Sequence, residues 1–535
     1  MGRLNLRIAT LAMRTISCVL LLAGSASGKN LTVQSGGGGN FATIQACATA
    51  MSPGDTCTVY AGTYNENVTV PAGTAGNYKT ITVNGSDVVS VTGGFTLNSY
   101  TKLSGMTLNH TGSCIGLNST ATNVFIGPNN SLTSCGTITT NSGNSYIFIQ
   151  GNTLAYAGCV PPNPSATCGR WFNVSGSHIL IENNDISHYQ LGVVLVASDR
   201  AIIRNNTFHD QLETEAGSNG HTDSVFSEPS AAVTNSVIEG NYQRYAVGPN
   251  AKGFLSQNDA GCGSTCNQLI IRYNVISRIG SGAITNDKSW PNVKAYNNTY
   301  VDANMDIGDT FGSTNNSISA PYASYLNDIY YYTQTSINNF NPYDCNNTNC
   351  NYGYNLYWCK GICTLIWGHT YGSGTFTSDP GNLNANPLFV NYVSAGNPSN
   401  DFHLQAGSPA IAAGTYLTTA SGSGSSSTSL VVASVSFFQD GYGLSNSYST
   451  VQGDCISVTT VSNHVCITSV NYSTNTLTLA SPISWSNGDH IWLYSKSDGV
   501  QVLTGSAPDM GAFPYGSGGG GGTPTPPTGL AAVVQ

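Results

Sequence analysis

Residues 179–187 read ILIENNDIS, and this pattern occurs six times in the middle of the chain. Each copy places alternating apolar residues before an Asn and a short apolar stretch after it. The other copies are YIFIQGNTL (146–154), AIIRNNTFH (201–209), SVIEGNYQR (236–244), LIIRYNVIS (269–277) and VKAYNNTYV (293–301). The Asn recurs every 22 to 24 residues, or about ten residues later in the longer copies. Short strands with an Asn at one bend predict a parallel β-solenoid whose Asn side chains stack between coils.

The composition supports an elongated, turn-rich β architecture. The chain has 535 residues, of which 61 are Gly and only 8% are charged. Asn, Ser, Thr, Tyr and Val dominate, and helix-forming residues are scarce. The formal charge of -9 and the lack of a basic stripe argue against nucleic acid and anionic membranes as partners.

The first 28 residues have the layout of a secretory signal peptide. Arg3, Arg7 and Arg14 flank the start of the apolar run SCVLLLAG, and small residues follow it. No later segment has 18 consecutive apolar residues, so no transmembrane segment is expected. The sequence therefore predicts a secreted, extracellular protein, which we expect to be a monomer.

Cysteine spacing predicts disulfides. Of 15 cysteines, Cys18 lies in the leader, and the other 14 fall in close couples, as expected of an exported chain. The couples are Cys47 with Cys57, Cys114 with Cys135, Cys159 with Cys168, Cys262 with Cys266, and Cys455 with Cys466. Cys345, Cys350, Cys359 and Cys363 form a closer series whose pairing the spacing leaves open, with a zinc site as the alternative.

The sequence resembles the right-handed parallel β-helix, or pectate-lyase-like, superfamily of bacterial secreted proteins, over most of residues 30–415. The entry segment NFATIQACATAMSPGDTCTVYAGTY resembles that family's beginning, with a short capping helix from Phe41 to Ala50. DFHLQAGSPAIAAGT and PDMGAFPYG are similar to its closing motif. The resemblance implies an all-β fold and a substrate groove on one sheet flanked by long loops.

Five regions are expected along the chain. Residues 1–28 are the leader, 29–415 the β-helix, 416–507 an inserted small β module, and 508–516 the closing strand of the β-helix. Residues 517–535 form a Gly/Pro/Thr linker whose end, PPTGLAAVVQ, resembles the first strand of a fibronectin type III module.

The candidate site follows from aligning the third strand of successive coils. The alignment puts Val194, Val225, Leu255 and Ile284 in one inward column and brackets this sheet with long loops. Its outward residues are expected to be Glu228, Asn258 and Asp287 in one column, with Lys288 beside them and His221, Asp223 and Lys252 at the strand starts. Tyr242, Tyr245, Trp171 and Trp290 are candidates for stacking on sugar rings.

Two chemistries are open at this sheet. Carboxylates two coils apart are separated by about 9.6 Å, which suits an inverting glycosidase with Glu228 and Asp287 as the pair. Elimination needs a base such as Lys288 or His221, and Asp210, Glu213, Glu215 or Asp223 would bind a calcium ion. TNDKSWPNVKAYNNTY also resembles the base-lysine segment of chondroitinase B-like and alginate lyases, although the calcium-binding glutamates of that family are absent.

The alternating column Glu182, Arg204, Glu239, Arg272 and Tyr296 is interpreted as an exposed ladder of ion pairs, each stabilising the fold by about 0.2 to 1 kcal/mol. The expected function is a secreted enzyme that cleaves an extracellular polysaccharide, as a glycoside hydrolase or a polysaccharide lyase. The alternative is a non-catalytic carbohydrate-binding protein, adhesin or stalk.

Overall fold

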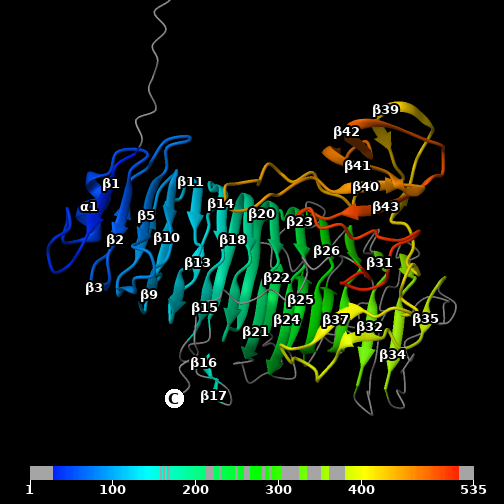
Figure 1. Ribbon diagram of the computed structural model, residues 1–535, viewed down its shortest axis with the longest axis horizontal. Coiled ribbons are helices and arrows are strands. Elements are labelled where there is room, and N and C mark those ends of the chain that lie inside the picture. The colour runs from blue at the N-terminus through cyan, green and yellow to red at the C-terminus, as the bar shows by residue number, and fades with distance from the viewer. Residues whose placement is uncertain are drawn as a thin grey trace, which may run out of the picture.

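The computed structural model describes residues 28–156, 159–160, 163–164, 169–212, 222–227, 231–247, 251–257, 266–279, 283–287, 292–303, 324–333, 351–360 and 380–516. In this part of the chain the strands wind into a right-handed parallel β-helix (Figure 1). The predicted leader and the predicted linker therefore lie outside the described residues, apart from Gly28. The all-β fold class is confirmed.

The described strands form two long parallel sheets and several small ones. The first long sheet contains β1 (Asn30–Val33), β2 (Thr56–Val59), β5 (Lys79–Val83), β8 (Thr101–Leu103), β11 (Thr122–Ile126), β13 (Ile138–Thr139), β14 (Ser145–Gln150), β18 (Arg170–Glu182), β20 (Leu191–Arg204), β22 (Thr222–Ser227), β23 (Thr234–Glu239), β25 (Ala251–Gln257), β26 (Asn267–Arg272), β28 (Ile284–Asp287), β29 (Val293–Tyr296), β31 (Ser324–Leu326) and β33 (Asn351–Gly353). The second contains β3 (Gly62–Tyr64), β6 (Val89–Val91), β9 (Thr107–Asn109), β12 (Ser131–Thr133), β15 (Thr153–Ala155), β19 (Asp185–Ser187), β21 (Thr207–Leu212), β24 (Tyr242–Val247), β27 (Val275–Ile279), β30 (Thr299–Ala303), β32 (Ile329–Tyr332), β34 (Leu356–Cys359) and β35 (Leu383–Asn384).

The smaller sheets are β4 (Val68–Val70) with β7 (Phe95–Leu97) and β10 (Ile115–Leu117), β16 (Cys159–Val160) with β17 (Asn163–Pro164), and β36 (Phe389–Asn391) with β37 (Asp401–Leu404). The last is an antiparallel sheet of β38 (Thr418–Thr419), β39 (Gly424–Val431), β40 (Cys455–Val458), β41 (Thr460–Asn471), β42 (Thr476–Trp485) and β43 (His490–Ser495).

The repeated Asn residues form a buried ladder. Asn184 Nδ2 donates to Asn206 Oδ1 over 3.0 Å, and the backbone N–H of Asn184 donates to the same oxygen over 2.9 Å. The same pattern joins Asn130, Asn152, Asn184, Asn206, Asn241, Asn274 and Asn298, and then reaches Asp328. Each amide satisfies the buried groups of its neighbour, so the ladder sets the register of the coils.

The predicted inward column is wrong at two of its four positions. The register aligns Val193, Val225, Phe254 and Ile284, and these four lie in the main core. Val194 belongs to a separate small cluster with Leu191 and Phe226, and Leu255 pairs with Phe226. The prediction slipped by one residue in those two coils, which moves a side chain to the opposite face of a strand.

Each coil bends at residues in the left-handed region, where non-Gly residues are uncommon. One column of these bends precedes the Asn ladder and includes Asn183, Asn205 and Asn297, with φ of 55°, 54° and 55°. A second column lies within or directly after the strands of the second sheet and contains His188, Asp210, Tyr245, Arg278 and Asp302.

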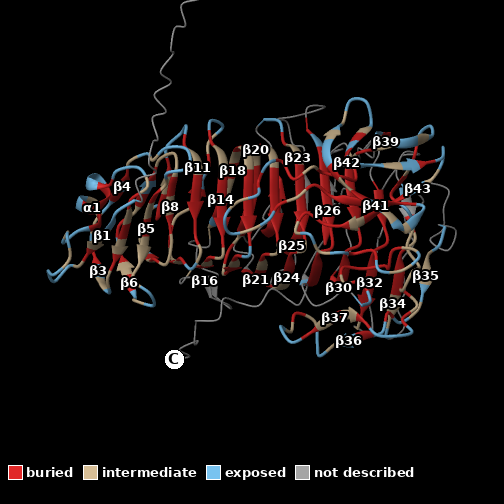
Figure 2. Ribbon diagram, turned by 45° about the horizontal axis from the view of Figure 1, so that its top comes forward, coloured by how far each residue is buried: buried red, intermediate tan, exposed pale blue. Residues whose placement is uncertain are grey.

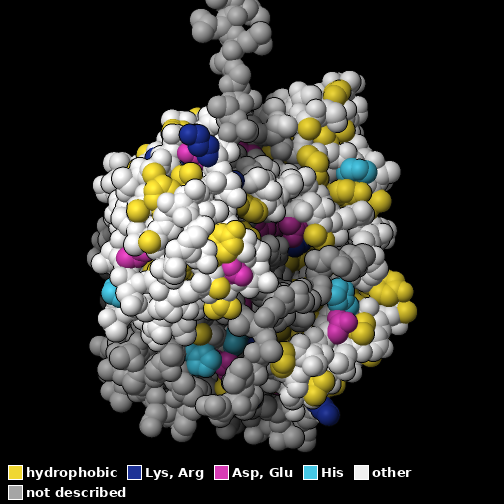
Figure 3. Space-filling model, turned by 60° about the vertical axis from the view of Figure 1, so that its left-hand side comes forward, with side chains coloured by type: hydrophobic (Ala, Val, Ile, Leu, Met, Phe, Trp, Pro, Cys, Tyr) yellow, Lys and Arg dark blue, Asp and Glu magenta, His cyan; other side chains and the backbone are white. Residues whose placement is uncertain are grey.

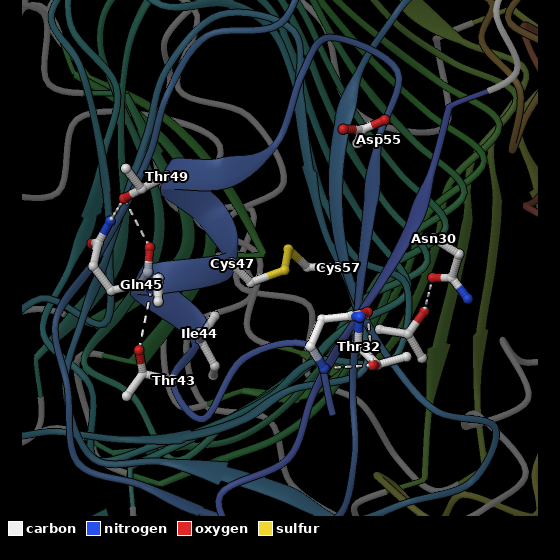
Figure 4. The surroundings of a disulfide bond; sticks show 12 residues. Asn30, Thr32, Thr43, Ile44, Gln45, Cys47, Thr49, Asp55 and Cys57 are labelled. Atoms are coloured by element: carbon white, nitrogen blue, oxygen red, sulfur yellow. Dashed lines mark hydrogen bonds between the residues drawn. A yellow bond between two sulfur atoms is a disulfide. The ribbon is translucent and has the colours of Figure 1, made fainter. Parts of the chain in front are cut away.

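The helix α1 (Ile44–Ala50) closes the first coil, as expected (Figure 4). Thr43 caps it by accepting from the backbone N–H of Ala46, and Glu66 accepts from the N–H groups of Ile44 and Gln45 at 2.8 and 2.9 Å. A disulfide joins Cys47 on this helix to Cys57 on β2. No helix among the described residues is long and apolar enough to span a membrane.

Two further predicted disulfides are present, Cys114 with Cys135 and Cys455 with Cys466. Cys266 and Cys359 are disulfide-bonded as well. The bond at Cys359 argues against zinc in the predicted series, whose other members Cys345, Cys350 and Cys363 lie outside the described residues. The couple of Cys159 and Cys168 also lies outside the described side chains.

The antiparallel sheet of residues 418–495 packs on the outer face of the first long sheet. Phe148, Leu180 and Ile202 of the β-helix share one core with Phe437, Ile456 and Ile491. From this sheet a segment of residues 439–452 runs back along the β-helix, as Figure 1 shows above β14 and β20. Gln150 Nε2 donates to Ser449 Oγ over 2.9 Å, and Arg204 donates to the carbonyl of Thr450 over 2.9 Å.

The ladder of alternating charges is therefore buried, contrary to the prediction of an exposed one. Arg204 is 1% exposed, and Arg272 and Glu239 are fully buried. Arg272 Nε donates to Glu239 Oε2 over 2.6 Å. Its two terminal nitrogens donate to the two carboxylate oxygens of Asp454, each over 2.7 Å. The inserted residues cover this face (Figure 2), so the ladder ties the two parts of the chain together.

Candidate active site

Two of the predicted site residues are direct neighbours on the third-strand sheet. Asp223 on β22 pairs with Lys252 on β25 and, on its other side, with Leu191 on β20. The side chains of Asp223 and Lys252 are 0% and 1% exposed. In the register of β20, β22 and β25, the residue aligned with Gly192 and Gly253 is Ser224 and not Asp223. The pair therefore lies at the strand starts, as predicted, but is enclosed.

A buried hydrogen-bond network fixes the backbone on both sides of Asp223. Gln211 Nε2 donates to Thr222 Oγ1 over 2.7 Å, and Gln243 Nε2 donates to Gln211 Oε1 over 2.8 Å. Ser224 Oγ lies 2.8 Å from the hydroxyl of Tyr189. These contacts hold the corner between the second sheet and the third-strand sheet.

Most of the other predicted site residues lie outside the described residues; these are His221, Glu228, Asn258, Lys288, Trp290, Glu213 and Glu215. For Asp287 the backbone is described. It pairs with Gln257 of β25, and Asn258, which was expected in its column, is not among the described residues. The proposed carboxylate pair of Glu228 and Asp287 stays a prediction.

Tyr242 and Trp171 do not lie on a sugar-binding surface, contrary to the prediction. Tyr242 is 3% exposed, its hydroxyl donates to the carbonyl of Asn397 over 3.2 Å, and its ring packs edge-on against Phe402. Burial raises its pKa to about 12. Trp171 is fully buried, and its Nε1 donates to the carbonyl of Ser187. The sequence pattern could not anticipate that residues 389–404 cover this part of the second sheet.

A histidine on the outer face of the second sheet is held between two carboxylates. His209 Nε2 lies 2.7 Å from Asp185 Oδ1 on the previous coil, and Nδ1 lies 2.5 Å from Asp210 Oδ2. Burial opposes the charged form, but the two carboxylates outweigh it and raise the pKa of His209. Both ring nitrogens donate in the charged form, so the imidazolium of His209 persists to higher pH than that of a free histidine.

A second histidine beside it has the opposite shift. His188 lies on the previous coil, with its ring centroid 6.5 Å from that of His209. Burial lowers its pKa, although Asp210 and Asp185 act the other way, and its buried Nδ1 has no hydrogen-bond partner in the described part of the chain. His188 is therefore neutral at a pH where His209 is charged.

On the next two coils of the second sheet, two arginines and a tyrosine lie beside the two histidines. Arg244 pairs in register with His209, and the Arg278 guanidinium lies 4.5 Å from the ring centroid of Tyr245. We call Asp185, His188, His209, Asp210, Arg244, Tyr245 and Arg278 the histidine cluster. Figure 3 shows His, acidic and basic side chains gathered low on one face of a mostly uncharged surface.

Residues 389–404 border the histidine cluster on the side of Arg278. The backbone N–H of Gly396 donates to Ser277 Oγ over 2.9 Å, directly beside Arg278. The side chains of Asp185, His209 and Asp210 stay 23%, 15% and 29% exposed. The cluster therefore keeps several titratable groups partly accessible to solvent.

Of the four predicted calcium ligands, Asp223 is described but fully buried, and the other described one is Asp210. Its carboxylate is bound to His209, whose hydrogen bond and charge outweigh burial and lower the pKa of Asp210. Within the residues that are described, no three His, Cys, Asp or Glu side chains are grouped to hold a metal ion. Glu213 and Glu215 lie outside them, so the calcium site stays a prediction.

Sequence reasoning missed the roles of Asp185, His188, Arg244 and Arg278. A usable signal was the repeat itself, because the aligned copies place Ser187, His209 and Arg244 at one position. The next position in each coil then brings together His188, Asp210 and Tyr245.

No family model matches the sequence, and no curated protein is significantly similar to it. Among solved structures the chain is similar to XylC, determined in complex with xylose, at 10% identity over 86% of this chain and 99% of that one, with a TM-score of 0.41. It is also similar to a PL6 family polysaccharide lyase from Pseudopedobacter saltans, at 12% identity over 67% and 92% with a TM-score of 0.37. A third is pectate lyase Pel9A, at 15% identity over 75% and 95% with a TM-score of 0.35. At such identities the likeness concerns the fold.

Proposed function

We propose that this protein is an extracellular carbohydrate-active enzyme that cleaves an acidic polysaccharide by elimination at the histidine cluster. The disulfides of the described chain and the leader-like first 28 residues support an oxidising, extracellular setting. The long, partly exposed face of the second sheet suits an extended substrate.

The observation that carries the proposal is the opposite pKa shift of two neighbouring histidines. Burial lowers the pKa of His188, whereas Asp185 and Asp210 raise the pKa of His209. Pairs of titratable groups whose environments move their pKa values apart are suited to act as base and acid. His188 is the base in this proposal, and His209 is the acid.

Elimination requires both roles. His188 takes the proton on the carbon next to the uronate carboxylate, and the electron pair of that C–H bond forms a carbon–carbon double bond. The bond to the glycosidic oxygen breaks, and the oxygen receives a proton from His209, whose Nε2–H must turn from Asp185 to the substrate for this step. The new unsaturated end and the new hydroxyl end together contain the atoms of the original chain.

The two arginines favour an acidic substrate. Arg244 and Arg278 lie on successive coils after His209, and Arg278 is exposed. A cation close to the uronate carboxylate makes the neighbouring proton more acidic. Hydrolysis through Asp210 as general acid is less favourable, since the pKa of Asp210 is lowered and the group stays ionised.

The test is digestion of neutral and uronate polysaccharides with and without a chelator, reading both ultraviolet absorbance of the unsaturated product and reducing ends. Elimination gives both readouts, whereas reducing ends alone indicate a glycoside hydrolase with a pair such as Glu228 and Asp287. Binding without cleavage indicates the adhesin. Loss of activity with chelator supports calcium held by Asp210, Glu213 and Glu215.

Substitution tests the assignment of the base. We expect His188→Ala to lower kcat about 10²- to 10⁴-fold. His403→Ala is the control, because His403 is another partly buried histidine but lies in residues 389–404, outside the histidine cluster. A full loss in Lys288→Ala with His188→Ala fully active would move the base to the third-strand sheet.

A further inference from the structure

One face of the inserted sheet bears a row of aromatic and histidine side chains. In β43 the residues alternate, so Ile491 and Leu493 are buried in the core, 0% and 3% exposed, while His490, Trp492 and Tyr494 point to the other face. We call Tyr416, His464, His490, Trp492 and Tyr494 the aromatic row. Residues two apart in a strand are separated by about 6.8 Å, so three of its members follow one line.

The rings of the row are ordered by stacking. Tyr416 and His490 stack with centroids 3.9 Å apart, and His464 and Tyr494 stack with centroids 4.0 Å apart and planes only 3° apart. Trp492 lies between the two pairs along the strand and meets His490 edge-on at 6.1 Å. Tyr416 is 37% exposed and His464 and His490 are exposed, whereas Trp492 is only 8% exposed and lies beneath its neighbours.

Small residues opposite the rings leave room for them to lie across the sheet. Ser457 on β40 pairs with both His464 and Trp492, and Thr419 on β38 pairs with His490. A face with large rings over Ser and Thr presents flat apolar surfaces whose edges carry hydrogen-bonding groups. It contains no Lys, Arg, Asp or Glu and no large aliphatic side chain among its five members.

We propose that the aromatic row binds a neutral polysaccharide. A pyranose ring offers an apolar face of C–H groups and a rim of hydroxyls, which match a ring face and the polar edges of His, Tyr and Trp. An acidic chain would find no cation in the row to pair with its carboxylates. The proposal is independent of the histidine cluster, which lies on another sheet across the β-helix (Figure 1).

Binding is measured by affinity electrophoresis of the full chain in gels containing xylan, glucomannan or mixed-linkage glucan, with polygalacturonate and alginate as acidic probes. We expect at least one neutral polymer to retard the protein. Tyr416→Ala and His490→Ala should each weaken that binding about fivefold or more, since both side chains are exposed, whereas the buried Trp492 only supports them. Tyr515→Ala is the matched control, since Tyr515 is 42% exposed but lies outside the row.

The unfolding temperature of each variant, and its activity on acidic polymers, separate loss of the row from loss of the fold. Unchanged activity with lost retardation supports the proposal. Equal retardation of Tyr416→Ala and Tyr515→Ala overturns it, as does retardation by acidic polymers only. A dimer in solution that Tyr416→Ala dissolves would also overturn it, because the row would then contact a second copy.

Discussion

Replacing Asp328 with Asn should stabilise the protein, and the gain should grow with pH. Asp328 occupies a ladder position that Asn fills elsewhere, and its side chain is fully buried. Oδ1 accepts from the backbone N–H of Asn298 at 2.6 Å and from its Nδ2 at 3.2 Å. Burial nevertheless dominates and raises the pKa of Asp328 from 3.8 to about 8.

The sign of the effect follows from proton binding. Between about pH 4 and pH 8 the folded chain keeps the proton of Asp328, whereas the unfolded chain loses it, so stability falls as the pH rises through this window. A shift of roughly four pKa units at about 1.4 kcal/mol each corresponds to a loss on the order of 5 kcal/mol. Asn carries no such loss and can also donate to Asn355, as other ladder residues do.

The assay is denaturant or thermal unfolding of the native protein and Asp328→Asn at about pH 4, 6 and 8. We expect a small difference at pH 4 that increases by several kcal/mol at pH 8. Asn298→Asp, which places a second acid in the same ladder, should show the opposite trend. A difference that is constant across the three pH values would refute the reasoning, since Asp328 would then be ionised alike in both states.

Three other changes test the packing. Arg272→Met leaves the buried Glu239 and Asp454 without their cation. We expect the free energy of unfolding to fall by about 3 to 5 kcal/mol and proteolysis within residues 416–507 to become faster. Unchanged stability would show that the network is dispensable. Asn206→Ala removes the ladder contacts to Asn184 and Asn241 and should cost about 2 to 4 kcal/mol by urea unfolding; a cost below 1 kcal/mol would contradict a register role. Replacing both Cys114 and Cys135 with Ser opens a loop with a sequence separation of 21, and the free energy of unfolding should fall by about 2 to 4 kcal/mol. Chemical reduction of the native protein should cause a loss at least as large.

The repeat predicted the β-helix because its determinants are local. An Asn at one bend and alternating apolar residues before it are visible in the sequence, and the ladder uses those residues. The ladder continues through Asp328 and Asn355, which the pattern did not reveal because an acid replaces Asn at the first of these positions.

The one-residue slip at Val194 and Leu255 has a local cause. The coils that contain Val194 and Leu255 enter the third strand from corners at His188 and Tyr245, whose left-handed backbone interrupts the alternation of faces. Loops of different length also precede the third strands, so an alignment of these strands by sequence alone leaves their relative register open by one residue.

The burial of the charged ladder results from contacts with segments that are distant in the sequence. Glu239 and Arg272 alternate as an exposed ladder would, and the sequence around them does not indicate that Asp454 and Ser497 cover them. The same holds for Tyr242, which residues near Asn397 enclose. Burial imposed by a segment more than 100 residues away in the chain has no signature in local alternation.

The two ends of the inserted module leave the β-helix side by side. The N–H of Gly414 donates to the carbonyl of Pro508 over 2.8 Å, and that of Ala412 donates to Asp509 over 2.7 Å. A short turn could therefore replace the whole intervening segment without disturbing the last coils. The uncovered face would then expose the ion pairs of Glu182 with Arg204 and of Glu239 with Arg272, and also the apolar side chains of Phe148, Leu180 and Ile202. Gain or loss of the module in a single genetic event would therefore also require polar residues at these apolar positions to keep the bare solenoid in solution.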